Sequence, residues 1–321
     1  MGDLKGEVVC VTGASGFVGS WLTKLLLSKG YIVHGTVRDP GDEKKVAHLH
    51  KLEGASEKLK LFEADLLDYN ALLSAINGCS GVFHVASPLP SSAVLNPQVE
   101  LIDPAVKGTL NVLNACVEAK VKRAIVVSSG AAVSMNPSWP KDQVKDETCW
   151  SDTEFQKKLN NWYGVSKTEA ESAALEFAQR SGLDVVRVCP VLVLGPILQS
   201  TANSSTLFLL RQLKDEGQKS KESRLQKIVD VRDVAEALVL AYEKPEAEGR
   251  YICAAHMIMS KDFIHKLKSL YPQYDYPRFD EEHEEPKMSS EKLKKLGWSC
   301  RTLEETLIDS IQSYRVAELL E

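Results

Sequence analysis

The strongest constraint on the fold of this 321-residue chain is a regular alternation of short apolar stretches with longer amphipathic ones. The apolar stretches are nearly continuous, which is typical of strands buried on both faces of a parallel sheet. Strands are expected at 7–13, 31–38, 59–65, 81–87, 123–129 and 183–190, and helices at 17–30, 43–54, 69–79, 97–120 and 159–181. The pattern predicts an α/β fold, a Rossmann-type doubly wound parallel sheet with helices on both faces.

The alternation ends after Pro190, and the remainder has fewer apolar stretches and more polar ones. We therefore expect a Rossmann domain over 1–190 and a smaller C-terminal lobe over 191–321. A helix near 230–244 is expected to pack back onto the sheet. The polar stretch 214–224 and the acidic run 280–285 are expected to be solvated loops. In the last helix, Thr302 and Glu305 form a capping box and the apolar face is Leu303, Leu307 and Ile311.

The overall charge and the cysteine pattern narrow the class of protein. The net charge of −5 argues against a general nucleic-acid or membrane-surface binder. No apolar run approaches the roughly 20 residues needed to cross a bilayer, and the N-terminal residues show no signal peptide. The seven cysteines form no CxxC pair and no zinc spacing, so no metal is expected. These features predict reduced thiols and a cytoplasmic location.

A glycine-rich loop joins the first expected strand to the first helix. The segment TGASGFVG places Gly13, Gly16 and Gly19 where backbone can approach a pyrophosphate at the helix N-terminus. A structural glycine turn is the alternative, but the strand–loop–helix context favours a dinucleotide. After the second strand, Arg38 stands where an NAD enzyme normally has an acid, and a guanidinium matches a 2′-phosphate. The loop and Arg38 together predict NADP(H).

A second motif lies in the segment NNWYGVSK, where Tyr163 and Lys167 are four residues apart. On a helix this spacing puts both side chains on one face. The nearby ammonium favours the phenolate, so we expect the pKa of Tyr163 to lie below its usual value of about 10. A partly solvated surface pair is the alternative for an isolated YxxxK.

The glycine loop, VVSSGAAV after the fifth strand and YxxxK on the next helix together resemble the extended short-chain dehydrogenase/reductase superfamily, over nearly the whole chain. The segments NNWYGVSK, DETCWSD, RVCPVLVLGPILQ, VDVRDVAEA and TVRDPGDEKKVAHL resemble the plant group of cinnamoyl-CoA reductases and dihydroflavonol reductases. The resemblance implies a triad in which Ser129 bonds the substrate carbonyl oxygen and Tyr163 donates the proton. Lys167 would hold the nicotinamide ribose and lower the tyrosine pKa. Ser129 is preferred to Ser128 because it is the second serine of the pair.

The resemblance also implies a binding site for NADP(H), with the C-terminal lobe mainly binding substrate. Lys44 would add positive charge, although a solvated helix face is an equal alternative, and Asp65 would meet the adenine amino group. Substrate contacts would come from Pro88 and Phe208. The implied cofactor residues are Gly13, Ser15, Gly16, Phe17, Val18, Gly19, Arg38, Lys44, Asp65, Leu66, Val85, Ala86, Ser87, Pro190, Val191, Leu192, Val193 and Ser205.

Three positions depart from the cinnamoyl-CoA reductase pattern. Gly164 replaces the cysteine that commonly follows the tyrosine, while Phe208 and Arg211 stand where a histidine and a lysine are usual near the CoA moiety. A core-facing Phe208 is the even alternative to a substrate contact. The departures favour NADPH-dependent reduction of hydroxycinnamyl-type aldehydes to alcohols, as in a cinnamyl alcohol dehydrogenase of this superfamily, in phenylpropanoid and lignin metabolism. Reduction of hydroxycinnamoyl-CoA is the alternative, ahead of a dihydroflavonol-type ketone reductase or a sugar-nucleotide epimerase.

Overall fold

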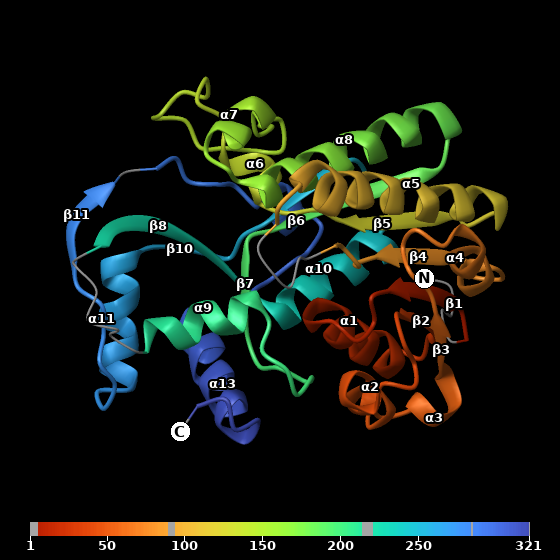
Figure 1. Cartoon of the computed structure of the whole chain (residues 1–321), viewed down its shortest axis with the longest axis horizontal. Helices are drawn as coiled ribbons and strands as arrows, with labels where there is room; N and C mark the ends of the chain where they lie inside the picture. Colours follow the sequence, from red (N-terminus) through yellow and green to blue (C-terminus); the bar gives the residue numbers. More distant parts are fainter. Residues whose placement is uncertain (1–5, 89–93, 214–220, 284, 321) are drawn as a thin grey trace.

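A computed structural model describes residues 6–88, 94–213, 221–283 and 285–320. The first five residues and the part of the polar stretch at 214–220 lie outside the described residues. The core is a seven-stranded parallel sheet in the order β3-β2-β1-β4-β5-β6-β9 (Figure 1). Its strands are β1 (Val8–Thr12), β2 (Ile32–Val37), β3 (Leu59–Glu63), β4 (Gly81–His84), β5 (Arg123–Val127), β6 (Asp184–Pro190) and β9 (Arg250–Cys253). The predicted doubly wound Rossmann-type sheet is confirmed.

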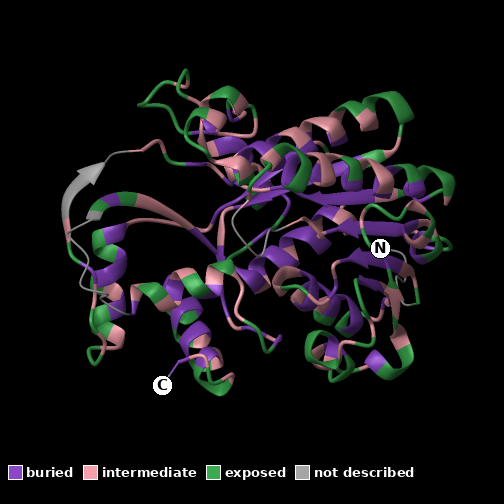
Figure 2. Cartoon of the chain, in the orientation of Figure 1, coloured by how far each residue is buried: buried purple, intermediate pink, exposed green. Residues whose placement is uncertain are grey.

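Helices cover both faces of this sheet, because its strands are apolar on both sides. One apolar cluster joins the sheet to α1 (Phe17–Ser28), α2 (Glu43–His50) and α10 (Val231–Glu243). The cluster on the other face includes α4 (Tyr69–Ile76), α5 (Asp103–Glu118) and α8 (Trp162–Ser181). Figure 2 shows the sheet strands buried and the outer faces of these helices exposed. Short helical segments are α3 (Ala55–Lys58), the π-helical turn η1 (Gln98–Ile102), α6 (Ala131–Ser134) and α7 (Thr153–Lys158).

A second layer, formed by residues beyond 190, is built around a smaller sheet at the left of Figure 1. Its strands are β7 (Leu192–Leu194), β8 (Lys221–Asp230), β10 (His256–Met259) and β11 (Phe279–His283), and β8 pairs with the other three. An apolar cluster packs this sheet against α9 (Ser204–Gln212), α11 (Ser260–Leu270) and α13 (Leu303–Val316). The remaining helix is α12 (Glu291–Lys295). Leu303, Leu307 and Ile311 of α13 are buried in this cluster, as predicted. Of the predicted capping box the structure shows one half: Thr302 accepts the amide N–H of Glu305 at 3.2 Å, whereas Oε1 of Glu305 lies 3.7 Å from Nε of Arg301.

Several elements differ from the sequence expectation. The acidic run 280–285 is not entirely loop, because β11 crosses it and pairs in parallel with β8. Residues 221–224 of the polar stretch likewise begin β8, which offers both edges to partner strands. The helix expected at 97–120 starts with a π-helical turn before α5. The seventh strand, β9, was not anticipated because its four residues, Arg250–Cys253, are too short to show a period.

Candidate active site

The glycine loop forms a closely packed cradle at the start of α1. Gly13 has a φ of +67°, and a Cβ there would lie 3.0 Å from the Cβ of Ala86. A Cβ on Gly19 would lie only 2.2 Å from the carbonyl oxygen of Gly13. Gly16 precedes the helix without any side-chain cap, so the first helical N–H groups remain available to an anion. The loop, with Ser15, Phe17 and Val18, therefore fits a pyrophosphate.

The residues after β2 suit a cofactor that carries a 2′-phosphate. Arg38 is exposed directly after the strand, and in the part of the chain that the structure describes no carboxylate pairs with it. Asp39 is instead used locally, since its Oδ1 accepts the N–H of Gly41 at 2.8 Å. A free guanidinium with no competing acid fits a phosphate better than a ribose hydroxyl. Asp65 is exposed after β3, and its Oδ1 accepts the N–H of Leu67 at 2.9 Å.

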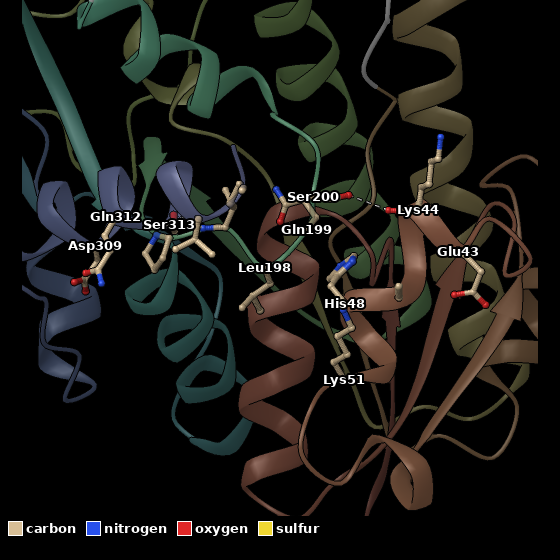
Figure 3. Close-up of a pocket in the computed structure, with 15 residues that line it drawn as sticks. Glu43, Lys44, His48, Lys51, Leu198, Gln199, Ser200, Asp309, Gln312 and Ser313 are labelled. Carbon is tan, nitrogen blue, oxygen red and sulfur yellow. Dashed lines mark hydrogen bonds between the residues drawn. The ribbon is translucent and has the colours of Figure 1, made fainter. Parts of the chain in front are cut away.

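Lys44 lies at the edge of a pocket of about 590 Å³ between α2, the segment 196–200 and α13. Figure 3 shows its ammonium group pointing away from His48 and Gln199. The Ser200 hydroxyl donates to the Lys44 carbonyl at 3.2 Å, which joins the segment after β7 to α2. Burial lowers the pKa of His48, which also lines this pocket. None of Ser129, Tyr163 and Lys167 lines this pocket.

The loop after β4 is held by a chain of neutral hydrogen bonds. Thr12 Oγ1 accepts the N–H groups of Val85 at 3.1 Å and Ala86 at 3.0 Å. Because both acceptor positions are then filled, its own proton goes to Nδ1 of His84 at 3.0 Å. His84 must therefore carry its proton on Nε2, which donates to Thr109 Oγ1 at 3.2 Å. Burial, with a smaller effect of Lys167, lowers the pKa of His84 to about 3, so the imidazole is neutral.

The two serines after β5 have different surroundings. Ser128 is buried, and its hydroxyl donates to Glu171 Oε2 at 2.5 Å. Ser129 is half-buried, and its Oγ accepts the N–H of Ala131 at 3.1 Å, which leaves its proton available. A hydroxyl committed to a buried carboxylate is a poor donor to a substrate, so the geometry favours Ser129 as the candidate catalytic serine.

Tyr163 and Lys167 lie on the first turns of α8. The Tyr163 side chain is 38% exposed, whereas Lys167 is 8% exposed and donates from Nζ to the carbonyl of Val127 at 3.3 Å. Val127 is the last residue of β5 and stands two positions before Ser129. The surface-pair alternative therefore does not hold for Lys167, because its ammonium is buried against the end of β5.

The segment after β6 lies directly against Ser129. The N–H of Gly130 donates to the carbonyl of Pro190 at 2.7 Å, and a Cβ on Gly130 would lie 2.8 Å from Cγ1 of Val191. Val191 in turn donates to the carbonyl of Cys253 at 3.2 Å. The expected nicotinamide segment, Pro190 to Val193, is thus beside the expected catalytic serine. Among the described residues, no group of three or more His, Cys, Asp or Glu side chains could hold a metal.

The comparisons with known proteins agree with this geometry. Residues 9–254 match the profile of the NAD dependent epimerase/dehydratase family. The chain belongs to this family. It is 46% identical over 318 residues to cinnamoyl-CoA reductase 1 of Petunia hybrida, covering 98% of this chain and 93% of the relative.

Two solved reductases have the same fold. Vestitone reductase from alfalfa, Medicago sativa, matches with a TM-score of 0.85 and 36% identity, covering 98% of this chain and 99% of that one. The yeast methylglyoxal/isovaleraldehyde reductase Gre2, solved in complex with NADPH, matches with a TM-score of 0.85 and 26% identity, covering 97% and 99%. The chain is an extended short-chain dehydrogenase/reductase of the plant cinnamoyl-CoA reductase and dihydroflavonol reductase-like group, as its motifs indicated.

Two of the positions at which the sequence departs from the expected cinnamoyl-CoA reductase pattern have a structural explanation. A Cβ on Gly164 would lie 2.6 Å from Nε2 of Gln156, a fully buried side chain whose Nε2 donates to the carbonyl of Ala131 at 2.8 Å. The glycine thus makes room for a hydrogen bond to the segment after Ser129. Phe208 packs into the apolar cluster of the second layer, with its ring centroid 6.4 Å from that of Phe263. That contact favours the core-facing alternative.

Other candidate residues are less directly connected to the triad. Ser205 lies in the first turn of α9, where its N–H donates to Asn203 Oδ1 at 2.8 Å. The backbone carbonyl of Leu66 accepts a hydrogen bond from Nδ2 of Asn111 at 2.9 Å. Ser87 and Pro88 line a small buried cavity together with Lys167.

Sequence reasoning missed the polar residues beneath the site. His84 was placed in a strand without a role, although a histidine at a strand end that opens into the cofactor loop was a usable signal. Glu171, Arg187 and Arg250 were missed too. An arginine inside the apolar strand β6 signals a buried partner, but the sequence does not identify that partner.

Proposed function

We propose that this chain is an NADP(H)-dependent reductase of hydroxycinnamoyl-type carbonyl compounds, small aromatic molecules of phenylpropanoid and lignin metabolism, with the CoA thioester as its leading substrate. The observation that carries the proposal is the 46% identity to a cinnamoyl-CoA reductase over 98% of the chain. Beside it stands the arrangement of the triad: Ser129 follows β5, and Tyr163 and the buried Lys167 lie on α8, with Lys167 bonded to the end of β5. This order reverses the expectation from the motifs alone, which favoured aldehydes. Substrate would enter from the lobe 191–321, beside Pro190 and Val191.

The proposed reaction uses Ser129 and Tyr163 on one oxygen. When bound, NADPH supplies the hydride that adds to the carbonyl carbon. The Ser129 hydroxyl bonds the carbonyl oxygen, and the negative charge that develops there is stabilised before any proton moves. Tyr163 donates its phenolic proton to that oxygen, and the Lys167 ammonium stabilises the resulting phenolate. With a thioester, the product of this addition is a hemithioacetal, which returns its hydroxyl proton to the Tyr163 phenolate as the carbon–oxygen double bond re-forms and the carbon–sulfur bond breaks. CoA leaves as the thiolate and takes a proton from solvent to become the thiol, and the aldehyde is the product.

Reduction of hydroxycinnamaldehydes to alcohols is the second candidate. The absence of a histidine at Phe208 favours an uncharged and compact substrate, whereas Arg211, exposed on the same helix, keeps a positive charge there. The same triad serves this reaction, because hydride again reaches the carbon next to the vinyl-aryl group. Six of the seven cysteines are buried and all are free thiols, which fits the proposed reducing cytoplasmic location.

The test compares feruloyl-CoA with coniferaldehyde under the same NADPH concentration. We expect kcat/KM for feruloyl-CoA to exceed that for coniferaldehyde by about tenfold or more, a difference of about 1.4 kcal/mol in transition-state binding. A preference for coniferaldehyde would move the assignment to the second candidate. No turnover of either compound would reject the proposed function.

A further inference from the structure

Three buried charges lie behind the candidate catalytic serine and take no part in the proposed reaction. Glu171 on α8 is 1% exposed, Arg187 on β6 is 6% exposed and Arg250 on β9 is 4% exposed. Arg187 and Arg250 are partners in the β6–β9 pairing, so their side chains share one face of the sheet. Glu171 Oε1 lies 2.6 Å from Nε of Arg250 and 3.6 Å from Nε of Arg187. One carboxylate therefore faces two guanidinium groups.

The cluster holds the Ser129 segment at both ends. On one side, Glu171 Oε2 accepts the hydroxyl proton of Ser128 at 2.5 Å, next to Ser129. On the other side, Arg250 Nη2 donates to the carbonyl of Ala132 at 2.9 Å and to Glu171 Oε2 at 3.0 Å. Arg250 is itself fixed, because Nη1 donates to the carbonyl of Cys149 at 2.7 Å and the guanidinium stacks 4.0 Å from the ring centroid of Trp150.

The same carboxylate belongs to the helix that carries the proton donor. Glu171 lies one turn beyond Lys167 on α8, so the two side chains share a face. Both line, with Ser128, a buried cavity of about 10 Å³ at the end of β5. Lys167 bonds the carbonyl of Val127 and Glu171 bonds the hydroxyl of Ser128, so successive residues of the β5 end are tied to α8.

We propose that Glu171 is a positioning residue of the reduction, which fixes the Ser129 segment against the helix that carries Tyr163 and Lys167, with Arg250 holding the carboxylate in place. This inference rests on the proposed function for its catalytic consequence. Buried ion pairs seldom stabilise a fold more than apolar residues of similar volume would. Accurate placement of Ser129 at the reacting oxygen explains why the cluster is present, whereas a contribution to stability does not. A displacement of about 1 Å at that oxygen costs about 100-fold in rate.

The first test separates positioning from stability. Ser128→Ala removes the hydroxyl bond to Glu171 and leaves all three charges in place, whereas Glu171→Gln removes the charge at nearly constant shape. We expect kcat to fall by about tenfold or more in both variants, with an unchanged Kd for NADPH. The matched control is Asp233→Asn, which breaks another buried ion pair, with Arg301, on α10. It is expected to lower stability and leave kcat unchanged.

The second test uses the sign of the charge. The alkaline limb of the pH–rate profile is where the rate falls because the proton donor has lost its proton. Glu171→Gln removes a negative charge, so this limb is expected to move to lower pH. Arg250→Met removes a positive charge, so the limb is expected to move to higher pH. A merely structural loss would move both in the same direction. Three other titratable groups face this cluster. His84 in the cavity has a pKa of about 3, burial raises the pKa of Cys189 to about 12, and burial lowers the pKa of the Arg187 guanidinium, which both variants retain.

Wild-type kcat in both Ser128→Ala and Glu171→Gln would overturn the proposal, as would shifts of equal sign in the two charge variants. If Glu171→Gln fails to fold, Ser128→Ala still decides. Hydrogen exchange of residues 128–134, expected to be at least several-fold faster in Ser128→Ala, reports positioning without any turnover. A wild-type enzyme that reduces neither substrate would reject the proposed function, and this exchange measurement would still test the inference.

Discussion

The two halves of the main sheet hold their functional loops by different physical means. Beside β1 and β4, the loops are fixed by glycine packing and by the neutral chain of Thr12, His84 and Thr109. Beside β5, β6 and β9, the Ser129 segment is fixed by the charges of Glu171 and Arg250. Neutral contacts keep their strength over a wide pH range, whereas buried charges impose a field on nearby groups. The proposed cofactor side is therefore suited to binding that is constant with pH, and the proposed catalytic side to proton transfer.

The largest expected effect tests the catalytic half alone. Tyr163→Phe should lower kcat by about 100-fold or more, because the proton donor to the carbonyl oxygen is lost. The Kd for NADPH should stay within about twofold and unfolding within about 0.5 kcal/mol, since the side chain is 38% exposed. Steady-state kinetics, with NADPH binding followed by fluorescence, measure both. A fully active variant would remove the proton-donor role.

The next effect tests the cofactor half. Arg38→Asp should change the ratio of kcat/KM for NADPH over NADH by about 10- to 100-fold in favour of NADH, because a charged hydrogen bond contributes about 1.5–3 kcal/mol. The pH profile of kcat should not move, since Arg38 lies after β2 and away from β5. Lys51→Asp, which reverses an exposed charge directly after α2, is the control. An unchanged cofactor ratio would contradict the phosphate contact.

A smaller effect sharpens the contrast between neutral and charged networks. The pKa of His84 falls from 6.5 to about 3 on folding, so between these values the unfolded chain binds one proton more than the folded chain. The contribution of His84 to the free energy of unfolding is therefore expected to be constant above pH 6.5. It should fall by about 1.4 kcal/mol per pH unit as the pH drops from 6.5 toward 3. His84→Asn should remove that slope, at a loss of about 1–3 kcal/mol at pH 7.

Urea unfolding at several pH values measures this slope, and the difference between variant and wild type isolates His84 from the carboxylates. His50→Asn, which changes an exposed histidine of α2, is the control and should retain the wild-type slope. If the free energy of unfolding changes with pH equally in wild type and His84→Asn, the imidazole takes up its proton as readily in the folded chain as in the unfolded one. The neutral account of the cofactor half would then be wrong.

No helix in the described part of the chain combines the length and apolar character needed to cross a membrane. Six of the seven main-sheet strands were predictable, because each is a short, nearly continuous apolar stretch, whereas β9 was not. The YxxxK pair was likewise predictable, because both residues lie on one helix and their relation depends only on helical geometry.

Local sequence thus determined the alternation of strands and helices up to Pro190, the glycine loop between the first strand and helix, and the shared face of Tyr163 and Lys167. Tertiary structure decided which serine is free, where Phe208 points and how Glu171 meets Arg250, which lies 79 residues away. The physical reason is the separation along the chain between the residues that interact. Backbone periods act between near neighbours, while the partner of a buried charge is chosen by strand order, and β9 reaches β6 only when the sheet is complete.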